Sequence, residues 1–190
     1  MLLTDEVSLA ILFLGIGAQV YLRSYFVRHH RLIWYISVAA IFGIAFYWSF
    51  LQYDVWQKHP LSKFLLPPYQ SLTYYLQYVG TRIVAPWTIS LLAALLLSEL
   101  ASRLNRRYGE RFFEREETGF LALGLFLSGY PGFIFYILLL LTFELLFSMY
   151  YTLRGKGRAP LYYFWFPLSI SAILIKNWLL PEKLLTFFNL

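Results

Sequence analysis

The feature that most constrains this chain is a run of twenty-five residues without charge, from Gly119 to Phe143. Nine more uncharged residues follow Glu144 before the next charge, at Arg154. A helix of about 18 or more apolar residues is long enough to cross the hydrocarbon core of a bilayer. The sequence therefore predicts an integral membrane protein. A carboxylate inside such a segment is costly, so each one becomes a candidate for function.

Composition supports the same class of protein. Of the 190 residues, 59% are hydrophobic and only 14% are charged, which is typical of polytopic membrane proteins. The net charge of +6 comes from Lys and Arg in short segments between apolar runs, a positive-inside pattern. We therefore expect the lipid bilayer, and no nucleic acid, as a partner. With no cysteine, disulfides and thiol catalysis are excluded, and we expect no metal or cofactor site.

The apolar runs predict an all-α, polytopic transmembrane helix bundle of about six to seven spans, in a single integral membrane domain over 1–190. The fifth run extends to Leu153 and is too long for one span. Turn residues at Ser128–Gly132 divide it into helices over about 118–129 and 131–153. Residues 181–190 are predicted to form a short interfacial helix. The six runs are 7–22, 32–53, 64–81, 83–98, 118–143 and 159–175.

Four segments in the second half follow one another in a distinctive order. Residues 121–132 read LALGLFLSGYPG, a Leu-rich stretch comes next, and then 154–158 read RGKGR and 164–168 read FWFPL. In this order and spacing the chain resembles the type IV prepilin peptidases, which are intramembrane aspartyl proteases of Gly-x-Gly-Asp type. The resemblance covers about 45–175. It implies a prepilin peptidase-like fold in the cell (inner) membrane and a type IV pilin-like precursor as partner.

The same resemblance implies two catalytic carboxylates. The first family aspartate corresponds to Asp54, which is followed by Pro60. The second lies eight residues before Gly124, at Glu116, with the neighbouring Glu117 as the alternative. An aspartyl protease needs one carboxylate as general base and one carboxylic acid to polarise the scissile carbonyl. On this interpretation the chain is an aspartic-type endopeptidase that cleaves pilin-like leader sequences at the cytoplasmic membrane face.

Two other functions stay open, because the family motif is degenerate in this chain. The Gly-x-Gly-Asp-x-Lys motif is replaced by FEREET at 113–118, without either glycine, the aspartate or the lysine. One alternative is a catalytically inactive assembly or chaperone-like subunit of the same fold. The other is a small transporter or channel subunit that uses Glu144. Ser148 lies four residues beyond Glu144, so the two share one helix face.

The basic segments leave two possible topologies. The segments 103–117 and 154–158 are separated by two predicted crossings, so both are expected in the cytoplasm. If 64–81 spans the bilayer, Asp54 is also cytoplasmic, but 23–31 with its three arginines lies outside. If 64–81 does not span, 23–31 lies inside and Asp54 outside. We favour the first topology, because only there can Asp54 meet Glu116.

Overall fold

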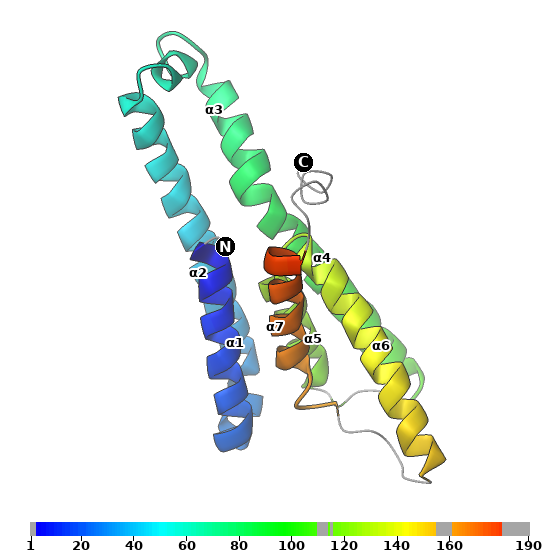
Figure 1. The fold of residues 1–190 in the computed structure, drawn as a ribbon. Helices are drawn as coiled ribbons and strands as arrows, with labels where there is room; N and C mark the ends of the chain where they lie inside the picture. Colours follow the sequence, from blue (N-terminus) through cyan, green and yellow to red (C-terminus); the bar gives the residue numbers. More distant parts are fainter. Residues whose placement is uncertain (1–2, 110–113, 115, 155–160, 180–190) are drawn as a thin grey trace.

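The computed structural model describes residues 3–109, 114, 116–154 and 161–179 (Figure 1). The predicted helix at 181–190 lies outside these residues. Within the described part the chain is all-helical, with no strand. The helices are α1 (Leu3–Tyr21), α2 (Arg23–Lys58), α3 (Leu72–Val79), α4 (Ala85–Arg107), α5 (Glu117–Ser128), α6 (Gly132–Leu153) and α7 (Trp165–Leu174). A 3-10 turn at Ser62–Leu65 and π turns at Gly80–Val84 and Ile175–Leu179 complete the structure.

Two long rods dominate the architecture. One is α2, with 36 residues, and the other is the continuous helix Leu72–Arg107, also with 36 residues. The sequence predicted two spans, 64–81 and 83–98, where the structure has this single second rod. The π turn at Gly80–Val84 comes just before Pro86, which lacks an N–H group for an α-helical hydrogen bond. A wider turn accommodates such a proline without ending the helix.

In the described part of the chain, four helices are long and apolar enough to cross a membrane: Leu3–Tyr21, Arg23–Lys58, Leu72–Arg107 and Gly132–Leu153. The prediction of six to seven spans was therefore too high. The predicted spans at 118–129 and 159–175 became α5 and α7, which have 12 and 10 residues. At 1.5 Å per residue, α5 is about 18 Å long and cannot cross about 30 Å of hydrocarbon. Every residue from Phe120 to Gly129 is buried, so α5 forms the centre of the bundle.

The predicted break between α5 and α6 is confirmed. Helix α5 ends at Ser128, and Gly129 adopts a φ of 63°, which favours glycine. A side chain could not replace it, because a Cβ there would lie 3.0 Å from the Trp87 ring. Pro131 occupies the N-cap of α6, one position before the first turn in which we expected it.

All the described basic segments lie at one end of the molecule, here called the basic end (Figure 1). Helix α1 runs directly into α2 through the single residue Leu22, so 23–31 is the start of α2 rather than a loop. An ion pair joins Arg23 to Glu114 over 3.9 Å, which brings the first basic segment to the second. The topology favoured from the sequence was therefore wrong. With one helix over 72–107, residues 23–31 share a side with 103–109, and Asp54 lies at the other end.

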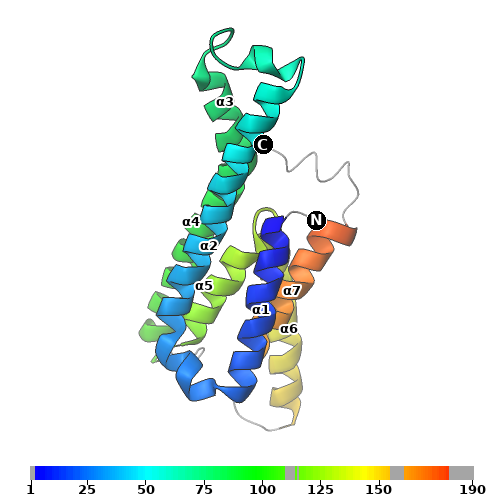
Figure 2. The ribbon, with the colours of Figure 1, turned by 90° about the vertical axis from the view of Figure 1, so that its left-hand side faces the viewer.

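Helix α1 packs along α7 in the bundle, as Figure 2 shows. Gly15 makes this approach possible, because a Cβ at this position would come within 2.9 Å of the Phe166 ring. Small residues allow such close packing between membrane helices. Near the basic end, the Gln19 side chain donates a hydrogen bond of 3.0 Å to the Tyr162 carbonyl and ties the two segments together.

Candidate functional site

Asp54 lies near the end of α2 that is remote from the basic end. Its carboxylate forms an ion pair of 2.6 Å with Lys58, one turn further along the helix. Both side chains are well exposed. Pairs of this kind contribute little to stability, because water competes for both charges.

Glu116 and Glu117 lie at the start of α5, at the basic end. Glu116 is the N-cap residue of α5 and lines a shallow cavity with Arg23, Ser24 and Val27 of α2 and the end of α1. Glu117 is buried, and its carboxylate accepts a hydrogen bond of 2.8 Å from the Glu114 backbone N–H. A carboxylate in the first turn of a helix also interacts favourably with the helix dipole.

The structure does not bring the two predicted catalytic positions together. Glu116 shares its cavity with Val27, and Asp54 lies 27 residues further along the same continuous helix. That offset corresponds to about 40 Å at 1.5 Å per residue. Two carboxyl groups that act through one water must lie within about 6 Å of each other. Asp54, Glu116 and Glu117 therefore form no aspartyl protease dyad in this conformation.

Glu144 lies in α6 and is partly buried, whereas Ser148, one turn later, is exposed. The Phe143 and Phe147 rings beside them pack against Phe164 in tilted arrangements. The two polar residues thus differ in environment, although their spacing placed them on one face. A proton or ligand pathway through Glu144 stays a prediction.

A buried ion pair that the sequence did not predict joins α1 to the π turn Ile175–Leu179, which follows α7. Lys176 Nζ lies 2.6 Å from Asp5 Oδ1. Asn177 donates to the other carboxylate oxygen over 3.1 Å. Asp5 and Lys176 are only 1% and 7% exposed. Buried charges of this kind persist only when they are paired and hydrogen-bonded, so the cluster is a candidate functional site.

A polar network continues from this pair into the bundle. Ser128 and Ser169 are hydrogen-bonded to each other over 2.9 Å, and both hydroxyls also contact the Gly124 carbonyl, at 2.7 and 3.0 Å. Beside the ion pair is a cavity of about 380 Å³. Its polar lining residues are Thr4, Asp5, Gln52, Thr81, Arg82 and Lys176.

One sequence signal could have indicated this cluster. Lys176 is the single charge within 159–179, a stretch that is otherwise apolar or uncharged. Its partner could not be inferred, because Asp5 lies 171 positions away.

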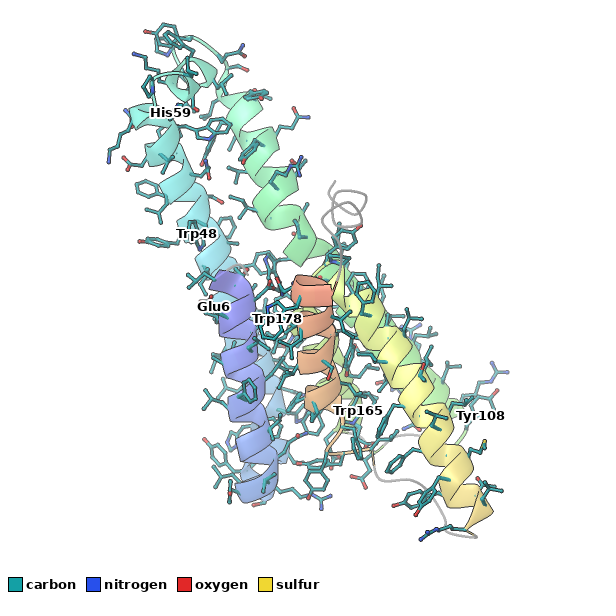
Figure 3. All side chains as sticks on the ribbon, viewed as in Figure 1. Glu6, Trp48, His59, Tyr108, Trp165 and Trp178 are labelled. Carbon is teal, nitrogen blue, oxygen red and sulfur yellow. The ribbon has the colours of Figure 1, made fainter. Side chains whose placement is uncertain are left out.

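The two rods meet in a second, smaller core at the end of the molecule remote from the basic end. Residues 49–79, which form this end, are here called the arm. Trp56, Leu66, Tyr75 and Val79 are buried there, and the Tyr75 hydroxyl donates to the Ser49 carbonyl. His59 marks the far end of the arm (Figure 3). Each rod is about 54 Å long, whereas a bilayer with its headgroups measures about 40–45 Å. The arm therefore extends about 10 Å beyond the bilayer when the basic end lies at the opposite headgroups.

The outer part of the arm has an exposed apolar surface, here called the tip patch. It consists of Val55, Leu61, Phe64, Tyr69, Leu72 and Tyr74. The Phe64 and Tyr69 rings contact each other, with centroids 4.8 Å apart. Contiguous apolar surface outside a membrane is typical of protein interaction sites.

Comparison with known proteins adds no relative, since no protein-family model, curated protein or solved structure matches the chain.

Proposed function

We propose that this chain is a catalytically inactive assembly subunit of the cell (inner) membrane, which holds an apolar segment of a partner protein on its tip patch. The observation that carries this proposal is the patch at the remote end of two rods of 36 residues each, a length that exceeds the thickness of a bilayer with its headgroups. The separation of Asp54 from Glu116 supports it, because paired carboxylates are required for the alternative, peptide hydrolysis.

The partner suggested by the resemblance is a type IV pilin-like precursor. Holding such a precursor requires apolar contact area and no acid–base chemistry. The tip patch supplies aromatic side chains, which contribute much of the binding energy at protein interfaces. Lys58 and Lys63 lie on the same arm, and their charges keep the apolar surface soluble.

The test places a photo-crosslinking amino acid at Tyr69 in the full chain, reconstituted in liposomes with a pilin-like precursor. The matched control carries the same group at Phe13, which is equally exposed but lies in α1, within the bundle. We expect an adduct with the precursor from position 69 and none from position 13. Equal yields from both positions would show nonspecific contact and contradict the proposal.

The same liposomes test the catalytic alternative. We expect the precursor to keep its full length with the wild-type chain and with the Asp54→Asn and Glu116→Gln variants. Leader cleavage by the wild type that either substitution abolishes would overturn the non-catalytic proposal and establish an aspartic endopeptidase.

A second function, transport of a small ion or solute, is favoured by the buried Asp5–Lys176 pair beside its cavity. Intramembrane ionisable residues often mark such pathways. If this function is correct, Lys176→Met abolishes flux into liposomes. Loss of flux in Glu144→Gln alone would instead assign the pathway to α6. Absence of flux in the wild type would exclude both the pathway at Lys176 and the pathway at Glu144.

A further inference from the structure

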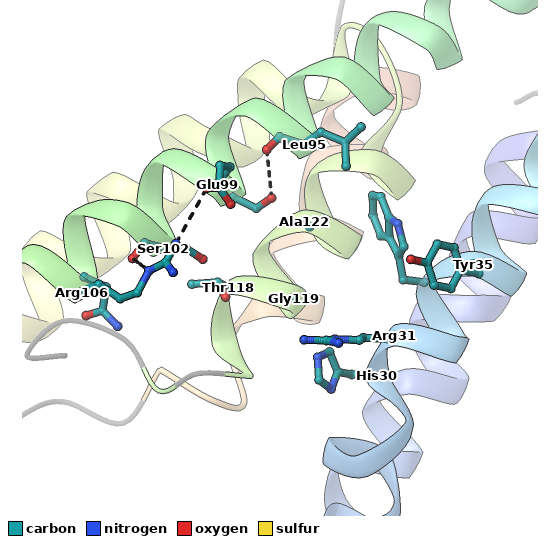
Figure 4. A pocket seen from close by; sticks show the side chains of 13 residues that line it. His30, Arg31, Tyr35, Leu95, Glu99, Ser102, Arg106, Thr118, Gly119 and Ala122 are labelled. Atoms are coloured by element: carbon teal, nitrogen blue, oxygen red, sulfur yellow. Dashed lines mark hydrogen bonds and ion pairs between the residues drawn. The ribbon is translucent and has the colours of Figure 1, made fainter.

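A third cavity, larger than the one beside the Asp5–Lys176 pair, opens near the basic end, between α2, α4 and α5 (Figure 4). Its volume is about 740 Å³. Neither the tip patch nor the Asp5–Lys176 cluster contributes to its lining. Its apolar walls include Trp34, Leu95 and Ala122. Its polar lining residues are His30, Arg31, Tyr35, Ser98, Glu99, Ser102, Asn105, Arg106 and Thr118.

Two guanidinium groups face this cavity from different helices. Arg31 of α2 makes no hydrogen bond or ion pair within the described part of the chain. Arg106 of α4 donates a long hydrogen bond of 3.4 Å to the Ser102 carbonyl and lies 3.8 Å from Glu99. The closer partner of Glu99 is Arg103, at 2.7 Å. Arg106 therefore keeps most of its five donors for a ligand.

The acid in the lining does not cancel the positive charge. Among the residues that the structure describes, Glu99 is matched by Arg103, which leaves Arg31 and Arg106 as two cations without a full counter-charge. His30 lies next to Arg31, and its Nδ1 is within 2.6 Å of the Val27 carbonyl, so this nitrogen carries the proton. A guanidinium presents its donors in a planar fork that fits the oxygens of a phosphate group.

The inner part of the cavity has apolar walls, beside the hydroxyl groups of Ser98 and Tyr35. Arg106 lies in the last turn of α4, at the basic end. Leu95 lies 11 residues earlier, which is about 16 Å further into the bundle. Trp34 lies about one turn deeper than Arg31 on α2. A ligand that fills this space must carry its anionic group at the mouth and an apolar part inside.

We propose that this cavity binds an anionic phospholipid from the leaflet at the basic end, with its phosphate between Arg31 and Arg106 and an acyl chain along Trp34 and Leu95. The apolar inner wall selects the lipid over free phosphate, because water there would find few polar partners. Basic pockets between membrane helices on the positively charged side suit lipid headgroups.

The test measures lipid binding to the purified full chain by native mass spectrometry, with phosphatidylglycerol and phosphatidylcholine as probes. We expect the wild type to prefer phosphatidylglycerol. In the Arg31→Gln/Arg106→Gln variant we expect affinity for it to fall by roughly 25-fold, about fivefold for each lost cation.

The matched control is Arg28→Gln/Arg107→Gln, which removes the same charge from the same two helices. Neither of these residues lines the cavity. We expect it to bind phosphatidylglycerol within about twofold of the wild type, because charges outside the cavity do not contact the bound headgroup and are screened by salt. An equal loss in both double variants would reduce the effect to net charge and overturn the proposal.

Two further arms separate the remaining outcomes. Arg31→Lys/Arg106→Lys keeps both charges and should retain the lipid preference, which distinguishes lost binding from failed folding. Inorganic phosphate should not displace phosphatidylglycerol at equal concentration. Displacement by phosphate, or equal binding of both lipids by the wild type, would contradict a lipid site.

Discussion

Lys176 and Asp5 form an ion pair of 2.6 Å between the last turn of the described chain and the first turn of α1. Lys58 and Asp54 form a pair of the same length within one helix. The side chains of the first pair are 9% and 2% exposed, and those of the second 75% and 43%. The two pairs have the same chemistry in opposite environments, so the consequences of breaking them should differ strongly.

We predict that Lys176→Met destabilises the protein by about 3–5 kcal/mol, because the Asp5 carboxylate is left buried and unpaired. The double variant Asp5→Asn/Lys176→Met should lose less than the sum of the two single variants. The control, Lys58→Met, should cost at most about 1 kcal/mol. The measurement is denaturant unfolding in one detergent. Similar losses in Lys176→Met and Lys58→Met would show that burial of the first pair contributes nothing.

A second prediction concerns Tyr136, whose hydroxyl is buried with no hydrogen-bond partner in the described part of the chain. Tyr136→Phe should be neutral or stabilising, because it removes a hydroxyl group that gave up its hydrogen bonds to water on burial. The Tyr136 hydroxyl lies 2.6 Å from the position of a Cβ at Gly124. Gly124→Ala should therefore cost about 1–3 kcal/mol, and less in the Tyr136→Phe background. Thermal unfolding of the four proteins checks this; a clear loss in Tyr136→Phe would mean that its hydroxyl is bonded.

The apolar runs predicted most of the helices, and the turn residues at 128–132 predicted the break between α5 and α6. These features are local, since they depend on hydropathy and on Gly and Pro. The same local rules failed at Arg82, the charge that separates the runs 64–81 and 83–98, because one helix continues through this residue and through Pro86. They also failed for α5, because an apolar segment has the same hydropathy whether protein or lipid surrounds the helix.

The site depended on contacts that hydropathy does not encode. Asp5 and Lys176 each lie near the end of an apolar run, where a charge is ordinary. The proposed pairing of Asp54 with Glu116 came from spacing along the chain, and spacing does not fix the side of the membrane. Because residues 72–107 form one helix, the chain crosses once there instead of twice. Glu116 therefore lies beside the start of α2, whereas Asp54 lies near its other end.

A third prediction tests whether the arm is a separate packing unit. Trp56 is buried there against the rings of Tyr74, Tyr75 and Tyr78. Trp56→Ala should increase hydrogen exchange within 49–79 and leave α5 and α7 unchanged, because local cores open independently of the rest. The control is Trp178→Ala, at an exposed position outside the arm. Faster exchange throughout the bundle in Trp56→Ala would show that the two cores open together.

The last prediction tests the placement of the two carboxylates directly. The natural sequence contains no cysteine, so spin labels can be attached at Asp54→Cys and Glu116→Cys without background. Pulsed electron spin resonance should give a separation of about 40 Å, the rise of α2 between Val27 and Asp54. The control pair, Ser24→Cys with Glu116→Cys, labels two residues that line one cavity and should give a short distance. A separation for 54 and 116 as short as that of the control pair would bring the carboxylates within reach of each other. That result would contradict the single helix over 72–107, which places Glu116 beside the start of α2 and Asp54 near its other end. It would also reopen the aspartyl protease interpretation, which requires Glu116 to lie beside Asp54.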